Sequence, residues 1–207
     1  MVEEVVSSFK RTVNPGLPYT LAEARAQLKN EEETYDDALV TTLIKASNRM
    51  AEQRTGCAFM QSTWECVLSE WSHDCNDVFK LYPGPLVKVS SIQYYPSGGG
   101  AITTLATSKY RVHTNPVPGY IEYIDDLPDV DDRQDAVKIT FVAGYGADGD
   151  NEATQQTALA AAVPDVIDWM KVQLATLYSY REALVAGKSV ANISTFMDMM
   201  IYPYIII

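Results

Sequence analysis

Apolar residues in the first third of the chain recur every three or four positions, the period of an amphipathic helix. Thr20 and Glu23 match a capping box and predict a short helix that ends at the acidic stretch 30–33. A second helix of roughly 20 residues is predicted from Thr34 to Gly56, with acidic residues in its first turn and arginines near its end. One face of this second helix is expected to form core, through Leu39, Leu43, Ala46 and Met50.

From Met60 the period of the apolar positions changes to two, as in a half-buried strand. Turns rich in glycine and proline then separate further β-rich runs, and the run Gly98–Gly100 is read as a hairpin loop. The pattern therefore predicts a small antiparallel β unit over residues 60–143, with strands at 60–68, 78–82, 87–95, 109–113, 120–124 and 136–143.

A long third helix is predicted between Val163 and Gly187. Pro164 is tolerated at the first helical position, and Asp165 suits the positive end of the helix. One face is expected to carry Ile167, Met170, Leu174, Leu177 and Arg181. We expect this helix to be the spine of the domain, with the β region on one side and the N-terminal helix pair on the other.

The remaining segments carry weaker patterns. Residues 1–18 are interpreted as an extension with turn chemistry, and the stretch before Val163 as a polar, alanine-rich connection. The fold class predicted is α+β: a helical bundle of two N-terminal helices and a long C-terminal helix, with the inserted antiparallel β unit. One domain is expected over 1–187 (helix pair 18–56, β insertion 60–143, long helix 163–187), followed by an extended tail over 188–207.

Charge and composition narrow the function. The 207 residues carry a net charge of −11, which argues against a protein that grips a phosphate backbone. Acidity fits a surface that repels DNA and equally a merely soluble surface. Three cysteines give no disulfide framework, and the sequence lacks a signal-peptide pattern and any apolar run of about 20 residues. We therefore expect a soluble protein of a reducing compartment.

Candidate chemistry is sparse. The histidines His73 and His113 have no nucleophile arranged beside them in the sequence. Cys66, His73 and Cys75 lack the tight C-x2-C spacing of structural zinc sites, so buried thiols are the favoured interpretation. The acidic run Asp125–Asp135 is typical of a solvated loop, with a calcium or magnesium site as the alternative. The sequence thus predicts no catalytic residue, no cofactor and no metal site.

The chain ends in an uncharged, mostly apolar segment. Burial of one isoleucine side chain is worth about 1.5–3 kcal/mol, so we expect this segment to be covered by protein. It could fold back into its own core, or dock on a neighbouring subunit or partner; Pro203 and the terminal position favour a docking arm. The candidate docking residues are Ile201, Tyr202, Pro203, Tyr204, Ile205, Ile206 and Ile207.

In the order of its segments the chain resembles the head–tail connector (adaptor) proteins of tailed double-stranded DNA phages, a family also present in gene-transfer-agent particles. The first 17 residues are extra, and Tyr202–Tyr204 is only loosely similar to the closing proline–tyrosine segment of the family. The matching segments cover most of residues 18–184 and are Pro18–Leu28, Asp36–Gly56, Gln61–Trp64, Leu81–Val87, Val89–Gln93, Tyr110–Val112, Val137–Gly146, Val163–Pro164 and Tyr180–Glu182.

The resemblance implies a structural protein of the virion neck rather than an enzyme. Such connectors assemble in the host cytoplasm as a ring of about twelve copies, whose interface is heterologous, on the portal protein. The ring extends the DNA channel, lets double-stranded DNA pass without specific binding, and receives a downstream neck or tail protein; no membrane is involved. In this interpretation Ile201–Ile207 is the portal-docking tail, and the turns Pro96–Gly100 and Asn115–Gly119 face neighbouring subunits or the phage tail.

Three other functions stay open at this point. Another neck component, such as a stopper or tail terminator, is disfavoured by the early helix pair, because those proteins tend to be β-dominated. A small metal-dependent hydrolase would use the carboxylates of Asp125–Asp135. A monomeric ligand-binding module is the third.

Overall fold

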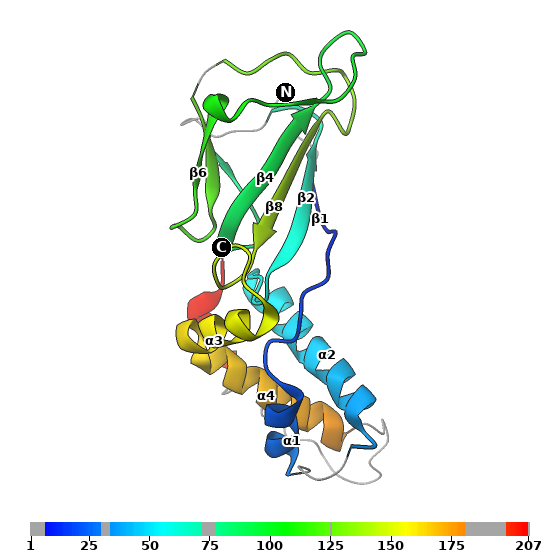
Figure 1. Ribbon diagram of the computed structural model, residues 1–207, viewed down its shortest axis with the longest axis vertical. Helices are drawn as coiled ribbons and strands as arrows, with labels where there is room; N and C mark the ends of the chain where they lie inside the picture. The colour runs from blue at the N-terminus through cyan, green and yellow to red at the C-terminus, as the bar shows by residue number, and fades with distance from the viewer. Residues whose placement is uncertain (1–6, 30–33, 72–77, 125, 181–197, 207) are drawn as a thin grey trace. The chain divides into compact units, whose positions relative to one another are not determined.

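A computed structural model of the protein describes residues 7–29, 34–71, 78–124, 126–180 and 198–206 (Figure 1). The chain divides into two compact units. The β unit comprises residues 1–15 and 61–148, and the helical unit comprises residues 16–60 and 149–207. The class is α+β with antiparallel sheets, as predicted from the sequence. Of the helices described, none is long and apolar enough to cross a membrane.

The helical unit holds four α-helices among its described residues. Helix α2 packs against α4, α1 packs against both of them, and α3 packs against α4. The predicted contact between the N-terminal helix pair and the long helix is therefore confirmed, while the side on which the β region lies stays a prediction. The helices are α1 (Leu21–Leu28), α2 (Asp37–Thr55), α3 (Glu152–Ala162) and α4 (Pro164–Ser179), followed by the 3₁₀ turn η2 (Tyr202–Tyr204).

The core face of α2 is one residue away from the predicted one. Val40, Ile44 and Ala51 are buried, together with Ser47, whereas the predicted face through Leu39, Leu43, Ala46 and Met50 is only half-buried. One residue turns a helix by about 100°. The shift places Ser47 inside, where it shares a hydrogen bond with the Tyr19 hydroxyl (3.3 Å) and donates one to the Ile44 carbonyl (2.9 Å). Burial of this hydroxyl is therefore tolerated.

Helix α4 is described as far as Ser179, and the predicted continuation to Gly187, including Arg181, lies outside the described residues. Its predicted face is confirmed at Ile167, Met170 and Leu174, which are buried. Burial extends further round the helix than predicted, to Val166 and Trp169, because α1, α2 and α3 all pack against α4.

The predicted connection before Val163 is wrong, because it contains helix α3. Asn151 caps this helix by accepting a hydrogen bond from the Thr154 backbone N–H (3.0 Å). Its alanines have the highest helix propensity, but Leu159 is its only buried residue, so the apolar period is faint. Helix propensity and the capping residue therefore indicate this helix in the sequence, whereas the spacing of apolar residues does not.

The β unit holds two antiparallel sheets among its described residues. A five-stranded sheet has the order β1-β2-β8-β4-β5, and a three-stranded sheet has the order β3-β7-β6. All six predicted strands are present, each with bounds within two residues of the prediction. The strands are β1 (Ser7–Arg11), β2 (Ser62–Leu68), β3 (Val78–Lys80), β4 (Leu86–Tyr94), β5 (Thr103–Thr104), β6 (Tyr110–His113), β7 (Tyr120–Tyr123) and β8 (Val137–Ala143), with a 3₁₀ turn η1 (Thr107–Lys109) before β6.

Strand β8 is the centre of the larger sheet and pairs with β2 and β4 along its length (Figure 1). Alternate residues Val137, Ile139, Phe141 and Ala143 are buried, which is the period-two pattern predicted from the sequence. The turn between β4 and β5 contains Gly98 (φ 92°) and Gly99 (φ 79°), so the predicted hairpin loop is confirmed.

The first strand corrects the interpretation of residues 1–18 as an extension. Strand β1 pairs antiparallel with β2, from Ser7 opposite Leu68 to Arg11 opposite Trp64. The Phe9 ring meets the rings of Tyr82 and Phe141 edge-on, each at 6.4 Å between centroids. The partners of this strand lie more than 50 positions away in the sequence, so no local pattern marks it.

Candidate functional site: the C-terminal segment

The C-terminal segment, residues 198–206, bends back on the helical unit. Tyr202–Tyr204 forms a 3₁₀ turn with Pro203 near its start, where the fixed backbone angle of proline fits a helical turn. Ile207, the last of the seven predicted docking residues, lies outside the described residues. The described part has an inward and an outward side.

The inward side caps the end of α2 with backbone atoms. The Ile206 backbone N–H donates a hydrogen bond to the Thr55 carbonyl (2.7 Å), one of the carbonyls that a helix end leaves without an intrahelical partner. The Cys57 thiol donates to the Tyr204 carbonyl (3.2 Å). Ile201 is 2% exposed and supplies the apolar part of the attachment.

Side chains at the start of the segment add a second attachment. Arg54, in the last turn of α2, forms an ion pair with Asp198, and its guanidinium lies 5.4 Å from the centre of the buried Trp169 ring. Gly56 follows with φ 72° and stands in van der Waals range of Ile206, since a Cβ there would lie 3.7 Å from the Ile206 Cβ. The end of α2 is thus the platform on which the segment lies.

The outward side carries an exposed apolar row. Tyr202 is 69% exposed, Met199 66% and Ile205 38%, and Pro203 is also exposed. We call Met199, Tyr202, Pro203 and Ile205 the outward row. Exposed apolar side chains gathered in this way are typical of a contact surface.

The thiol at this platform is not a nucleophile. Burial is the main cause that raises the pKa of Cys57 to about 11, so the group stays protonated at neutral pH and serves as a hydrogen-bond donor. The outward row contains no titratable group except the Tyr202 hydroxyl. The exposed surface of the outward row is therefore mostly apolar.

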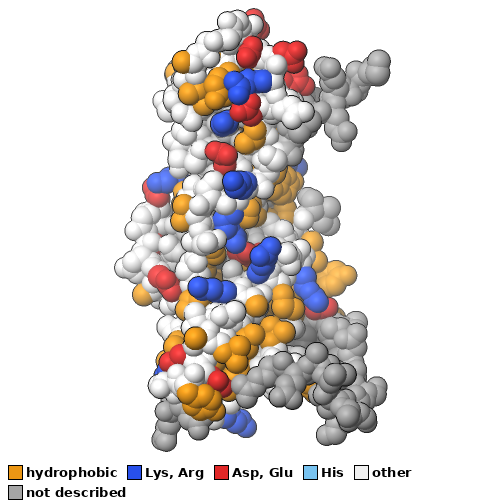
Figure 2. All heavy atoms as spheres, turned by 90° about the vertical axis from the view of Figure 1, so that its right-hand side faces the viewer, with side chains coloured by type: hydrophobic (Ala, Val, Ile, Leu, Met, Phe, Trp, Pro, Cys, Tyr) orange, Lys and Arg blue, Asp and Glu red, His pale blue; other side chains and the backbone are white. Residues whose placement is uncertain are grey.

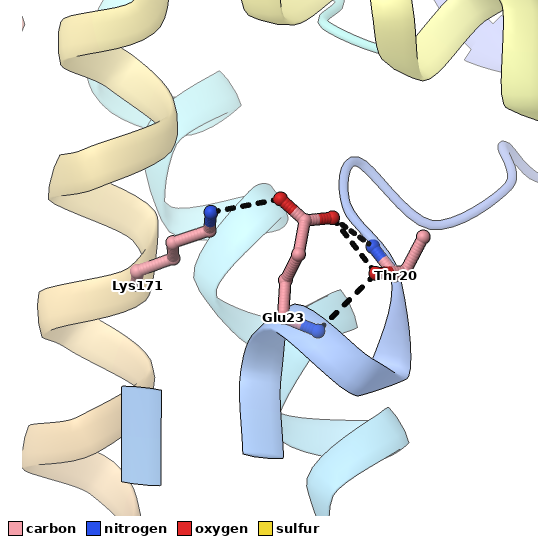
Figure 3. Close-up of polar contacts among 3 residues, drawn as sticks. All are labelled: Thr20, Glu23 and Lys171. Atoms are coloured by element: carbon pink, nitrogen blue, oxygen red, sulfur yellow. Dashed lines mark hydrogen bonds and ion pairs between the residues drawn. The ribbon is translucent and has the colours of Figure 1, made fainter. Parts of the chain in front are cut away.

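A second polar cluster joins α1 to α4 (Figure 3). Glu23 accepts hydrogen bonds from the Thr20 backbone N–H (2.9 Å) and hydroxyl (2.8 Å), while the Glu23 N–H donates to the Thr20 hydroxyl oxygen (3.2 Å). The other carboxylate oxygen accepts from Lys171 Nζ (3.0 Å). Burial alone would raise the pKa of Glu23, but the hydrogen bonds from Thr20 and Lys171 outweigh it and lower the pKa. The predicted capping box is confirmed, and its role is structural.

The histidines and cysteines considered from the sequence have structural roles, as far as they belong to the described residues. His113 Nε2 lies 2.8 Å from a carboxylate oxygen of Glu122, and its ring stacks on Tyr120 at 4.5 Å, so it is a hydrogen-bonded β histidine as predicted. Cys66 is buried, and burial raises the pKa of its thiol to about 12. His73 and Cys75 lie outside the described residues.

The acidic run Asp125–Asp135 is described from Asp126 onward. Asp135 pairs with Arg133 and with Lys138 (3.4 Å). Within the described ranges no group of three or more His, Cys, Asp or Glu residues is placed to hold a metal ion. The hydrolase alternative gains no support from this loop.

Charges on the visible surface are mixed. On the face shown in Figure 2, Lys and Arg side chains are spread out with Asp and Glu side chains between them.

No protein-family model and no curated protein matches the sequence. Solved structures match the fold. A chain in the neck of an empty gene-transfer-agent (GTA) particle, computed with C6 symmetry, has a TM-score of 0.73 at 19% identity and covers 97% of this chain and 96% of that chain. A chain in the virion of a native GTA particle has a TM-score of 0.71 at 20% identity, covering 96% and 95%. A chain in the neck of a native GTA particle, computed with C12 symmetry, has a TM-score of 0.69 at 18% identity, covering 97% and 96%.

These matches extend over nearly the whole chain and establish a shared fold. The resemblance to the connector family of phages and GTA particles, predicted from the order of the sequence segments, is thus confirmed at the level of the fold.

The sequence pattern predicts Ile201–Ile207 as one docking unit. The pattern does not separate buried Ile201 from the outward row, and it does not indicate the platform of Arg54, Thr55 and Cys57. Gly56 was the available signal, because a helix that ends there leaves carbonyl groups in need of partners.

Proposed function

We propose that this protein is a structural head–tail connector (adaptor) of a tailed double-stranded DNA phage or a related particle, and not an enzyme. The observation that carries the proposal is the fold shared with chains in the neck of GTA particles over 97% of this chain. In this proposal residues 1–187 act as one adaptor domain, a helical bundle with a β insertion, and residues 188–207 act as its docking tail. The protein would assemble in the host cytoplasm and reside in the virion neck.

The active form in this proposal is a ring of about twelve copies seated on the portal protein. The similar neck structures, computed with C6 and C12 symmetry, support a cyclic arrangement. A ring extends the DNA channel and offers a platform to the next neck or tail protein. The net charge of −11 suits a channel through which double-stranded DNA passes without binding.

The C-terminal segment is the proposed portal contact. Its inward side fixes the segment to the end of α2, and the outward row presents apolar side chains to the portal. One such contact is weak, but many copies engaging one portal make each later contact effectively intramolecular. The turns Pro96–Gly100 and Asn115–Gly119, which include exposed Val117, are proposed to face neighbouring subunits or the phage tail.

The test removes the outward row while keeping the platform. Tyr202→Ala together with Ile205→Ala should reduce co-purification of the protein with portal-bearing heads at least about tenfold, because apolar area is lost at every copy of the contact. Tyr180→Ala, which removes an exposed tyrosine outside the segment, is the matched control and should leave binding unchanged. Full recovery of heads with the double variant, or with residues 201–207 deleted, would contradict the docking role.

The alternative function is that of another neck component, a stopper or tail terminator. Such a component would also lie in the neck, but it would not bind the portal directly. Electron microscopy of the protein mixed with its cognate portal separates the two, because a connector forms a ring directly on the portal.

A further inference from the structure

The helical unit carries an exposed pair of cations on one helix and an exposed pair of carboxylates on another. Lys45 and Arg49 are one turn apart on α2, and Asp165 and Asp168 are one turn apart on α4. All four side chains are exposed, and none has an ion pair or hydrogen bond with another described residue.

Three other cations of this unit have carboxylate partners within the subunit. Arg25 pairs with Asp37, Arg54 with Asp198, and Lys171 with Glu23. Like charges one turn apart on a helix repel each other, and within each of these two pairs no ion pair of the described subunit offsets that repulsion. Two side chains of the opposite charge, supplied by another molecule, would offset that repulsion.

Both pairs lie outside the buried faces of their helices. On α2 the cations lie away from the buried face of Val40, Ile44 and Ala51. On α4 Asp168 lies opposite the buried Ile167 and Met170, and Asp165 lies at the edge of the buried face, one turn before Trp169.

We propose that Lys45 and Arg49 of one copy pair with Asp165 and Asp168 of the next copy around the ring. The inference rests on the proposed ring and assigns the surfaces that join its subunits. A cyclic ring requires two different complementary faces on each copy, which an α2 face and an α4 face supply. Residues one turn apart are about 5–6 Å from each other on both helices, so two ion pairs can form together.

An apolar stripe beside the cations completes the α2 face. Leu39, Leu43, Ala46 and Met50 are half-buried and lie on the flank of α2 that adjoins the charged side. Interfaces commonly combine an apolar centre with a polar rim, and charge complementarity then fixes the register and the partner.

Charge reversal tests the pairing. Lys45→Glu with Arg49→Glu, and separately Asp165→Lys with Asp168→Lys, should each weaken ring formation on the cognate portal at least about tenfold, because like charges then meet at every interface. An equimolar mixture of the two variants should form rings again, since each variant offers the face that the other needs. A chain carrying all four reversals should also recover. Electron microscopy counts the rings, and circular dichroism confirms that every variant is folded.

Matched controls reverse charges outside the proposed faces. Lys80→Glu and Asp126→Lys alter exposed residues of the β unit and should leave ring formation unchanged. Since Asp165 also lies in the first turn of α4, Asp168→Lys alone serves as the variant free of helix-end effects. Rings that tolerate both double reversals overturn the inference, as does a loss that the mixture fails to restore. If the unaltered protein forms no ring on its portal, the proposed function itself fails.

Discussion

Glu23 links two helices through the two oxygens of one carboxylate. One oxygen closes the capping box with Thr20, and the other accepts a hydrogen bond from Lys171 on α4. A glutamine retains the shape of the side chain and its capping ability but loses the charge. The contributions of the cap and of the ion pair can therefore be separated at this residue.

Glu23→Gln should lower the free energy of unfolding by a few tenths to about 1 kcal/mol at pH 7, as expected for a partly exposed ion pair. The folded-state pKa of Glu23 is lowered from its ordinary value of 4.5, so its contribution is complete above that value and is lost as the pH falls through the folded-state pKa. Urea unfolding from pH 7 to pH 3 should show a smaller loss of stability in the variant. Equal slopes for both proteins would contradict the role of the charge.

At the scale of elements, α2 shows where a periodic pattern is ambiguous. Leu39–Val40 and Leu43–Ile44 are adjacent apolar pairs, so two faces a residue apart fit the same period. Tertiary packing selects the face of Val40 and Ile44. This choice buries Ser47, whose hydroxyl shares a hydrogen bond with Tyr19 from the segment before α1.

The choice of face predicts unequal effects of neighbouring substitutions. Ile44→Ala should lower the free energy of unfolding by about 2–5 kcal/mol, because it empties a fully buried site. Leu43→Ala should have clearly less effect, since Leu43 is half-buried. Chemical denaturation of both variants measures the difference, and a larger effect at Leu43 would restore the face predicted from the sequence.

Elements marked by local signals could be predicted, and those held by distant partners could not. Short local patterns of a few residues indicate the capping box, the end of α2 at Gly56 and the alternation of buried residues in β8. Strand β1 depends on β2, and α3 buries little of its surface, so neither has a strong local pattern. The composition of the C-terminal segment predicted an apolar segment in need of cover. Gly56 indicated a helix end with carbonyls in need of partners, but not that this segment would supply them, because backbone carbonyls carry no side-chain signature.

At the scale of the whole molecule, acidity is the dominant electrostatic property. A net charge of −11 opposes the counterion release that drives binding to DNA. A channel protein gains from this property, because DNA that bound to the wall would be retained.

We therefore expect no measurable binding of double-stranded DNA at about 0.15 M salt, where non-specific DNA-binding proteins reach dissociation constants of about 10⁻⁴–10⁻⁶ M. Fluorescence anisotropy of a labelled duplex, titrated with the protein, measures this. Micromolar affinity that falls steeply with added salt would contradict passage without binding.

The attachment of the C-terminal segment has an evolutionary consequence. Its two hydrogen bonds to the end of α2 use the Ile206 N–H and the Tyr204 carbonyl, groups that nearly every amino acid possesses at those positions. Mutations at Tyr202 or Ile205 can therefore accumulate without loosening the anchorage. If the segment docks as proposed, a lineage could thus change the partner surface that the segment fits while the rest of the subunit is inherited unchanged.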